Sequence, residues 1–223
     1  MNTCSFGRKA QLLNVLIGLL GILVIVANIA ILERMLWRPA MARRKTQLCK
    51  ALATAVNLRC PGYMEWASNC ALLCQLVGSN LGFNEETLIS LNTAALLRGI
   101  GLCAIPFNLI QPGAKEHWSS ADKYVFEKHV DASRSMLLAM PNLRWVAKYL
   151  EPRDEEGIDF EVNQAKSVLQ IASDYCWHVH WDGPAYARQI LLQTKSGMPQ
   201  EEFIRLLLQV IPSDGIGATQ IAV

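Results

Sequence analysis

The sequence predicts an all-α protein, with a single N-terminal transmembrane helix followed by a helical body. Three observations support this fold class. The 21 residues of Leu12–Leu32 carry no charge, so the segment is long enough to cross the roughly 30 Å hydrocarbon core of a bilayer. Downstream, apolar residues recur at helical spacing between glycine and proline breaks. No run alternates apolar and polar residues for long enough to predict a strand.

The composition agrees with one membrane segment and one further domain. The chain has 223 residues, of which 52% are apolar, and its mean hydropathy is +0.19. Its net charge is only +2 and its cations gather beside the apolar segment, which argues against nucleic-acid binding. The seven cysteines are an odd number without the spacing of a disulfide scaffold, which favours free thiols in a reducing compartment.

The charges that flank the apolar segment predict its orientation. Two cations precede it and a larger group follows it, namely Arg34, Arg38, Arg43, Arg44, Lys45 and Lys50. Since the more positive flank stays in the cytoplasm, the C-terminal body is predicted to be cytoplasmic. These cations either set only the topology or also bind anionic lipid headgroups of the bilayer. A cleaved signal peptide is the alternative, but its apolar core would be shorter, and Glu33–Trp37 lacks a small-residue cleavage site.

Two asparagines interrupt the apolar segment. Asn14 and Asn28 lie two heptads apart, so both can face the seam between two such helices and donate hydrogen bonds across it. The spacing allows a homodimer through the membrane helix. In the alternative interpretation, Asn14 lies near the lipid headgroups and Asn28 is tolerated within the membrane helix without any role in association.

Caps and breaks divide the body into helices. Asn84, followed by Glu85 and Glu86, predicts a helix N-terminus, and Ser119 and Asp122 have the spacing of a capping box. The predicted helices cover approximately residues 46–58, 63–81, 84–97, 120–140, 143–150, 164–180, 184–194 and 199–210. The predicted organisation is a tail 1–10, a transmembrane helix 11–33, a basic juxtamembrane linker and helix 34–62, a helical domain 63–211 and a flexible tail 212–223.

The body is predicted to be arranged around Ala94–Pro106, whose sequence is AALLRGIGLCAIP. Strong helix formers are followed by Gly99, Gly101 and Pro106, so a helix ends there in a glycine-punctuated turn. This stretch resembles the corresponding segment of HD-GYP phosphodiesterases, the bacterial metal-dependent hydrolases of cyclic di-GMP. That segment reads roughly A-L-L-H-D-I-G-K-I-G-I-P, and its His-Asp pair binds the metals. Here Arg98 and Gly99 occupy the places of that pair.

The resemblance extends over approximately Tyr63–Ile211 and rests mainly on the order and spacing of segments. It places the former metal-site positions at Trp66, Arg98, Gly99, His129, Tyr149, Leu150 and Ser173, with Asp174 as a one-residue alternative to Ser173. Of these, His129 matches the family's residue. The family's Gly-Tyr-Pro motif would fall within 152–160, where it does not occur. The resemblance thus implies a degenerate HD-GYP-like bundle in a bacterial inner membrane.

Too few ligands remain for the family's metal centre, because such a centre needs several donors and bridging carboxylates. We therefore expect no catalytic residues, no metal and no cofactor. His129 is interpreted as a hydrogen-bonded histidine rather than a ligand. Arg98, His129 and Asp174 are the candidates for ligand or salt-bridge contacts. Arg98 either pairs inside the body, with Asp174 or with a phosphate, or points out to water.

Two cysteine-containing groups are candidates for alternative metal sites, and the sequence argues against both. Cys70 and Cys74 lie one helical turn apart but lack two further zinc ligands at a suitable spacing, so they are predicted to be small core residues. Cys176, His178 and His180 would share one face of a strand, whereas on a helix only the first and last do. The surroundings indicate a helix, and the neighbouring tryptophans indicate packing or an interface.

Three functions follow from these patterns. The leading prediction is a membrane-anchored, catalytically inactive HD-GYP-like signalling or scaffold module that binds partner proteins in the cytoplasm. The alternative is a sensor that binds cyclic di-GMP or another nucleotide without hydrolysing it. The third is an active phosphodiesterase with rearranged metal ligands.

Overall fold

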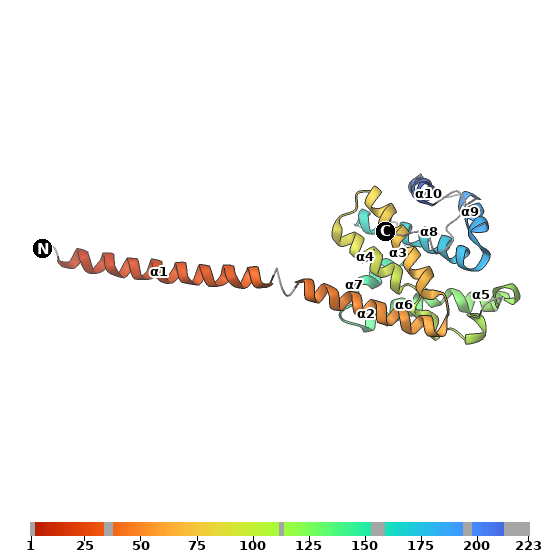
Figure 1. Cartoon of the computed structure of the whole chain (residues 1–223), viewed down its shortest axis with the longest axis horizontal. Coiled ribbons are helices and arrows are strands. Elements are labelled where there is room, and N and C mark those ends of the chain that lie inside the picture. The colour runs from red at the N-terminus through yellow and green to blue at the C-terminus, as the bar shows by residue number, and fades with distance from the viewer. Residues whose placement is uncertain (1–2, 34–37, 112–113, 153–158, 194–197, 212–223) are drawn as a thin grey trace. The chain divides into compact units, whose positions relative to one another are not determined.

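The computed structural model of the chain describes residues 3–33, 38–111, 114–152, 159–193 and 198–211 (Figure 1). These residues form helices and connecting turns, and none of them forms a strand, so the predicted all-α class is confirmed. The chain divides into two compact units, Met1–Leu48 and Cys49–Val223. The predicted flexible tail 212–223 and most of the acidic loop after Pro152 lie outside the described residues.

The first unit contains helix α1, Thr3–Leu32. From Ile17 onward its large apolar side chains are each 53–67% exposed. The amide of Asn28 donates to the carbonyl of Val24 within the same helix, at 2.8 Å. The side chain of Asn14 lies outside the part that the structure describes. The transmembrane assignment and the asparagine seam stay predictions.

Among the described residues, Glu85–Ala104 is the stretch that meets the length and apolarity of a membrane span, and 61% of it is buried inside the protein. This stretch is therefore a core element of the second unit. Ile17–Leu32 is a shorter apolar helical segment by the same criteria.

Three helices form the centre of the second unit: α3 (Tyr63–Asn80), α4 (Glu85–Leu97) and α8 (Phe160–Asp182). Helix α3 packs against both α4 and α8 (Figure 1). Leu73, Leu91 and Leu169 of these helices are completely buried. Cys70 and Cys74 of α3 are both buried, as predicted for small core residues. Apolar burial at the crossing of these helices is the main stabilising term of the unit.

The remaining elements cover this centre. Helix α6 packs on the turn that follows α4, α9 packs on α8, and α10 packs on α3 and α8. The bounds are α2 Arg38–Arg59, α5 Ser120–Glu127, α6 His129–Ala139, α7 Arg144–Ala147, α9 Pro184–Gln193 and α10 Met198–Val210, with 3₁₀ helices η2 Ile100–Ala104, η3 Phe107–Leu109, η4 Ala114–His117 and η5 Lys148–Leu150.

Both predicted helix caps are present. The side chain of Asn84 accepts from the backbone N–H of Thr87, and Asn84 also bonds the carboxylate of Glu161 on α8. Ser119 and Asp122 form a reciprocal capping box at the start of α5. These caps satisfy N–H groups that the first turn of a helix leaves without partners.

The single helix predicted over residues 120–140 is wrong, because it breaks between α5 and α6. The ring Nδ1 of His129 lies 2.7 Å from the carbonyl of Phe126. That carbonyl would otherwise accept the i+4 backbone bond of a continuous helix. The side-chain bond replaces a backbone bond, and a new helix begins at His129.

The predicted turn after α4 is confirmed and comprises residues 98–106, here called the elbow. The N–H of Gly101 donates to the hydroxyl of Ser133 on α6 at 2.8 Å. The same buried hydroxyl bonds the carbonyls of Arg98 and His129. A Cβ at Gly101 would lie 2.0 Å from the carbonyl oxygen of His129, so only glycine allows the two backbones to come this close.

On its other side the elbow meets α3. The hydroxyl of Tyr63 donates to the carbonyl of Leu96 at 2.7 Å and accepts from the N–H of Gly99 at 3.2 Å. A Cβ at Gly99 would lie 2.4 Å from the Tyr63 ring. The elbow is therefore held between α3 and α6 by hydrogen bonds and by close approach on both sides.

We expect Gly101→Ala to lower the free energy of unfolding by about 3 kcal/mol, since the added methyl overlaps backbone atoms of α6. Cys103→Ala is the matched control, because Cys103 is exposed on the same 3₁₀ turn and its change should stay within about 0.5 kcal/mol. Urea denaturation of the purified chain, followed by circular dichroism, measures both. Equal stability of the two variants would contradict the close approach.

Candidate functional site

A pocket of about 510 Å³ opens beside the elbow, where α3, α5, α6 and α8 meet, and is here called the elbow pocket. Its lining combines aromatic rings with charged and amide side chains. The lining residues are Trp66, Arg98, Trp118, Lys123, Phe126, Glu127, His129, Val130, Gln170, Ser173, Asp174 and Trp177.

One wall of the elbow pocket consists of aromatic rings. Trp177 of α8 contacts Trp66 of α3 edge-on, at 5.9 Å between ring centroids, and Phe126 of α5 at 4.8 Å. Trp118 extends the wall, 4.6 Å from Phe126. The indole N–H of Trp66 donates to the carbonyl of Ser173 at 3.4 Å, which orients its ring. A wall of this kind offers ring faces and edges to a planar ligand.

Arg98 lies in the elbow pocket and is 8% exposed. Its Nη2 donates to Oε1 of Gln170 at 2.7 Å, and Nε2 of Gln170 bonds both carboxylate oxygens of Asp174, at 2.9 and 2.7 Å. In the described part of the chain, Arg98 forms no ion pair with a carboxylate. A neutral amide therefore stands between the cation and the acid, and the direct Arg98–Asp174 contact considered from the sequence is replaced by this chain.

Two features of Asp174 follow from this arrangement. Loss of hydration in the pocket raises the pKa of Asp174, while the bonds from Gln170 and the charge of Arg98 lower it, and the first effect is the larger. Asp174 stands at the rim, where its side chain reaches solvent. The guanidinium of Arg98 is therefore buried, whereas the carboxylate that it reaches through Gln170 is exposed.

His129, the first residue of α6, is a hydrogen-bonded histidine, and its Nδ1 donates to the carbonyl of Phe126. Because the carbonyl of Phe126 only accepts, Nδ1 carries the proton and Nε2 is left as an acceptor. Burial lowers the pKa of His129 to about 4, and the nearby charge of Arg98 acts in the same direction. His129 is therefore neutral at pH 7.

The structure brings several sequence-predicted positions together in the elbow pocket, although they come from four different segments. These residues are Trp66, Arg98, His129, Ser173 and Asp174. Ser173 and Asp174 both line the pocket, so the one-residue choice between them does not change the site.

Three predicted positions lie elsewhere. Gly99 is buried behind the pocket against Tyr63. Tyr149 and Leu150 belong to η5 and are buried in the core, only 3% and 6% exposed. None of these three lines the elbow pocket.

Sequence reasoning missed the residue that connects the charges. Gln170 lies one helical turn before Asp174, and this i, i+4 spacing was the available signal. Trp118, which precedes α5, and Phe126, which lies on α5, were missed as pocket residues because no local sequence pattern connects them to α8. Their contact depends on tertiary packing.

The group Cys176, His178 and His180 lies on helix α8, as the surroundings predicted. Cys176 is buried in the core, whereas His178 points to Asp182 and bonds its carboxylate at 2.7 Å. Within the described ranges, no three histidine, cysteine or acidic side chains are placed to hold a metal ion together.

Comparison with known families bears on this helical body. Residues 50–157 match the family model of the HD domain. The match supports an HD-superfamily domain, whose fold is of the metal-dependent phosphohydrolase type. The HD match includes the elbow and His129 but ends before α8, which supplies Gln170 and Asp174 to the pocket. A comparison with curated proteins finds no match.

The elbow pocket does not fit the metal pair that an HD domain implies. Its possible donors are one imidazole, His129, and two carboxylates, Glu127 and Asp174. The Asp174 carboxylate is bonded by Gln170, and the buried cation Arg98 lies among these groups. Two divalent ions beside an arginine would repel it, and two carboxylates and one imidazole are few donors for an ion pair.

We expect acid to destabilise the protein through His129. Between its folded pKa of about 4 and its unfolded value near 6.5, the unfolded chain binds more protons, so stability falls as pH falls through this window. The contribution is at most about 3 kcal/mol. In His129→Asn, whose amide can still donate to Phe126, the loss of stability between pH 7 and pH 4 should be smaller by that amount. Denaturation at several pH values measures the difference, and parallel curves for the two proteins would contradict it.

Proposed function

We propose that the chain is a membrane-anchored, catalytically inactive HD-type signalling module that acts by binding rather than by hydrolysis. One observation carries this proposal: a hydrogen-bonded chain, Arg98–Gln170–Asp174, lies where the HD-GYP resemblance places the metal ligands. Partner proteins in the cytoplasm would receive the signal, as a scaffold role requires.

The chemistry of phosphodiester hydrolysis supports the inactive assignment. Metal centres that cleave phosphodiesters hold two ions a few ångströms apart and use them to activate water and to stabilise the departing oxygen. The elbow pocket instead offers a neutral His129 and a fixed positive charge on Arg98. A guanidinium binds phosphate well but does not lower the pKa of a water molecule to form hydroxide.

The proposed anchor is α1. Its large apolar side chains from Ile17 to Leu32 are exposed around the helix, and within these described residues no polar face is present that would suit a soluble helix. The cations that follow it favour a cytoplasmic body. The proposed location is thus the bacterial inner membrane, with a single span.

The elbow pocket favours a second function for the same module, that of a sensor. Within the described residues, the buried Arg98 donates to the neutral amide of Gln170 and forms no ion pair with a carboxylate, so it gains from an anion. The adjacent rings of Trp66 and Trp177 suit a flat base. Cyclic di-GMP or another nucleotide combines these two features. We therefore propose that the module binds such a ligand without hydrolysing it.

Arg98→Met tests this proposal with cyclic di-GMP and GMP as probes. Since the phosphate contact is lost, we expect affinity for the bound probe to fall at least tenfold. Arg98 pairs with an amide and not with a buried carboxylate. The free energy of unfolding of the Arg98→Met variant should therefore differ from that of the unchanged protein by only about 1 kcal/mol. Isothermal titration calorimetry of the purified chain measures affinity, and chromatography of the same samples shows whether the probe is cleaved.

Lys148→Met is the matched control, because it removes an exposed cation on η5, away from the elbow pocket. Its affinity should equal that of the unchanged protein. Cleavage of cyclic di-GMP with manganese or iron present would contradict the inactive assignment. Absence of binding by the unchanged chain would contradict the sensor and leave the scaffold role.

A further inference from the structure

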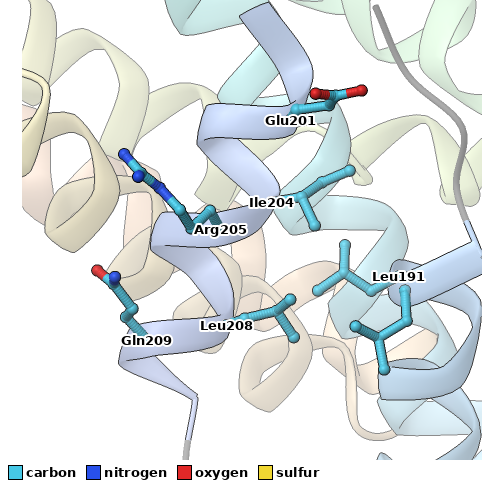
Figure 2. A pocket seen from close by; sticks show the side chains of 7 residues that line it. Leu191, Glu201, Ile204, Arg205, Leu208 and Gln209 are labelled. Atoms are coloured by element: carbon cyan, nitrogen blue, oxygen red, sulfur yellow. The ribbon is translucent and has the colours of Figure 1, made fainter. Parts of the chain in front are cut away.

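A second hollow, also about 510 Å³, lies between α9 and α10 on the surface of the same unit. Figure 2 shows Leu191 of α9 and Ile204 and Leu208 of α10 directed toward one another across it. The remaining lining residues are Leu192, Glu201, Arg205 and Gln209. This surface, here called the α9–α10 face, lies on different residues from those of the elbow pocket.

The lining residues of α10 fall on one side of the helix. Glu201, Ile204, Arg205 and Leu208 follow the three- and four-residue spacing of a helical face. Leu192 of α9, beside them, is 63% exposed. Leu191 and Ile204 are only 5% and 8% exposed, so Leu192 and the half-buried Leu208 supply the apolar surface that is open to water. The α10 side of the face adds two exposed opposite charges, Glu201 and Arg205.

The order of these charges makes the α9–α10 face complementary to itself. Glu201 and Arg205 are equally distant in sequence from residue 203. If two copies of α10 run antiparallel about a two-fold axis beside residue 203, Glu201 of each copy stands opposite Arg205 of the other. A contact between identical surfaces must pair residues in this reciprocal way.

The contact that Arg205 makes within its own chain leaves it available for this pairing. Its Nη2 lies 3.8 Å from Glu202, and the two side chains are 68% and 55% exposed. Exposed pairs at this distance contribute little and are easily replaced. Pairing two faces would cover the exposed Leu192 of both copies and provide each Arg205 with a second carboxylate.

We propose that the α9–α10 face joins two copies of this chain in a symmetric dimer. Apolar contact through Leu192 and its neighbours supplies the attraction, and the Glu201–Arg205 pairs set the antiparallel register. This interface is separate from any association of α1 and does not depend on ligand binding in the elbow pocket.

Charge reversal in the full-length chain tests the proposal. Two differently tagged copies are co-expressed and solubilised in detergent, and the fraction recovered together by sequential affinity purification is measured. Glu201→Arg or Arg205→Glu in both copies creates two like-charge contacts per dimer, so recovery should fall at least fivefold. Glu201→Arg in one copy with Arg205→Glu in the other creates two attractive contacts, and recovery should return to that of the unchanged pair.

The double variant Glu201→Arg with Arg205→Glu, present in both copies, is the matched control for folding. It carries both substitutions but restores opposite charges across the axis, so its recovery should also be normal. Leu192→Glu, which changes an exposed residue and spares the core, should lower recovery to the level of the like-charge variants in every charge background. Equal recovery for all charge combinations, or no joint recovery of the unchanged chain, would overturn the proposal.

Discussion

The structure of the second unit depends on the contact between the elbow and α6. The N–H of Gly101 bonds the buried hydroxyl of Ser133, and the two backbones come closer than any side chain at that position would allow. The same hydroxyl bonds the carbonyl of Arg98, so the contact fixes the backbone from which that side chain extends. Tyr63 holds the opposite side of the turn. A hydrogen bond made in the dry interior is costly to remove, and this makes the turn rigid.

A rigid elbow explains why Arg98 can stay buried without a direct ionic partner. Its guanidinium donates to the amide oxygen of Gln170 in the elbow pocket, and the amide nitrogen of Gln170 donates to the exposed carboxylate of Asp174. On the HD-GYP resemblance, metal ions would supply the positive charge at this place, and the proposed function has Arg98 supply it instead. The aromatic wall of Trp66, Phe126 and Trp177 keeps the pocket open beside that charge. On the proposed function, a phosphate-bearing ligand would use both features.

The sequence predicted the features that depend on residues close together in the chain, namely two helix caps and one turn. The cap at Asn84, the capping box at Ser119 and the turn after α4 each depend on residues within a few positions, and all are present. Four of the positions taken from the resemblance lie in one pocket, with Ser173 and its alternative Asp174 both among the lining residues. The sequence did not identify Gln170 as a site residue. Gln170 connects Arg98 to Asp174 only when α8 packs beside the elbow, and this packing is not visible in the sequence. The break before His129 was missed for a related reason, because a side chain took a carbonyl that periodicity assigns to the helix.

The central claim is that a side-chain network has replaced the metals in this HD-type pocket. Elemental analysis of the purified full-length chain, after incubation with manganese or iron and removal of unbound ions, tests it most directly. The account predicts far less than one ion per chain, and the same trace amount in His129→Asn and Asp174→Asn. Two ions per chain in the unchanged protein, lost in both variants, would contradict it.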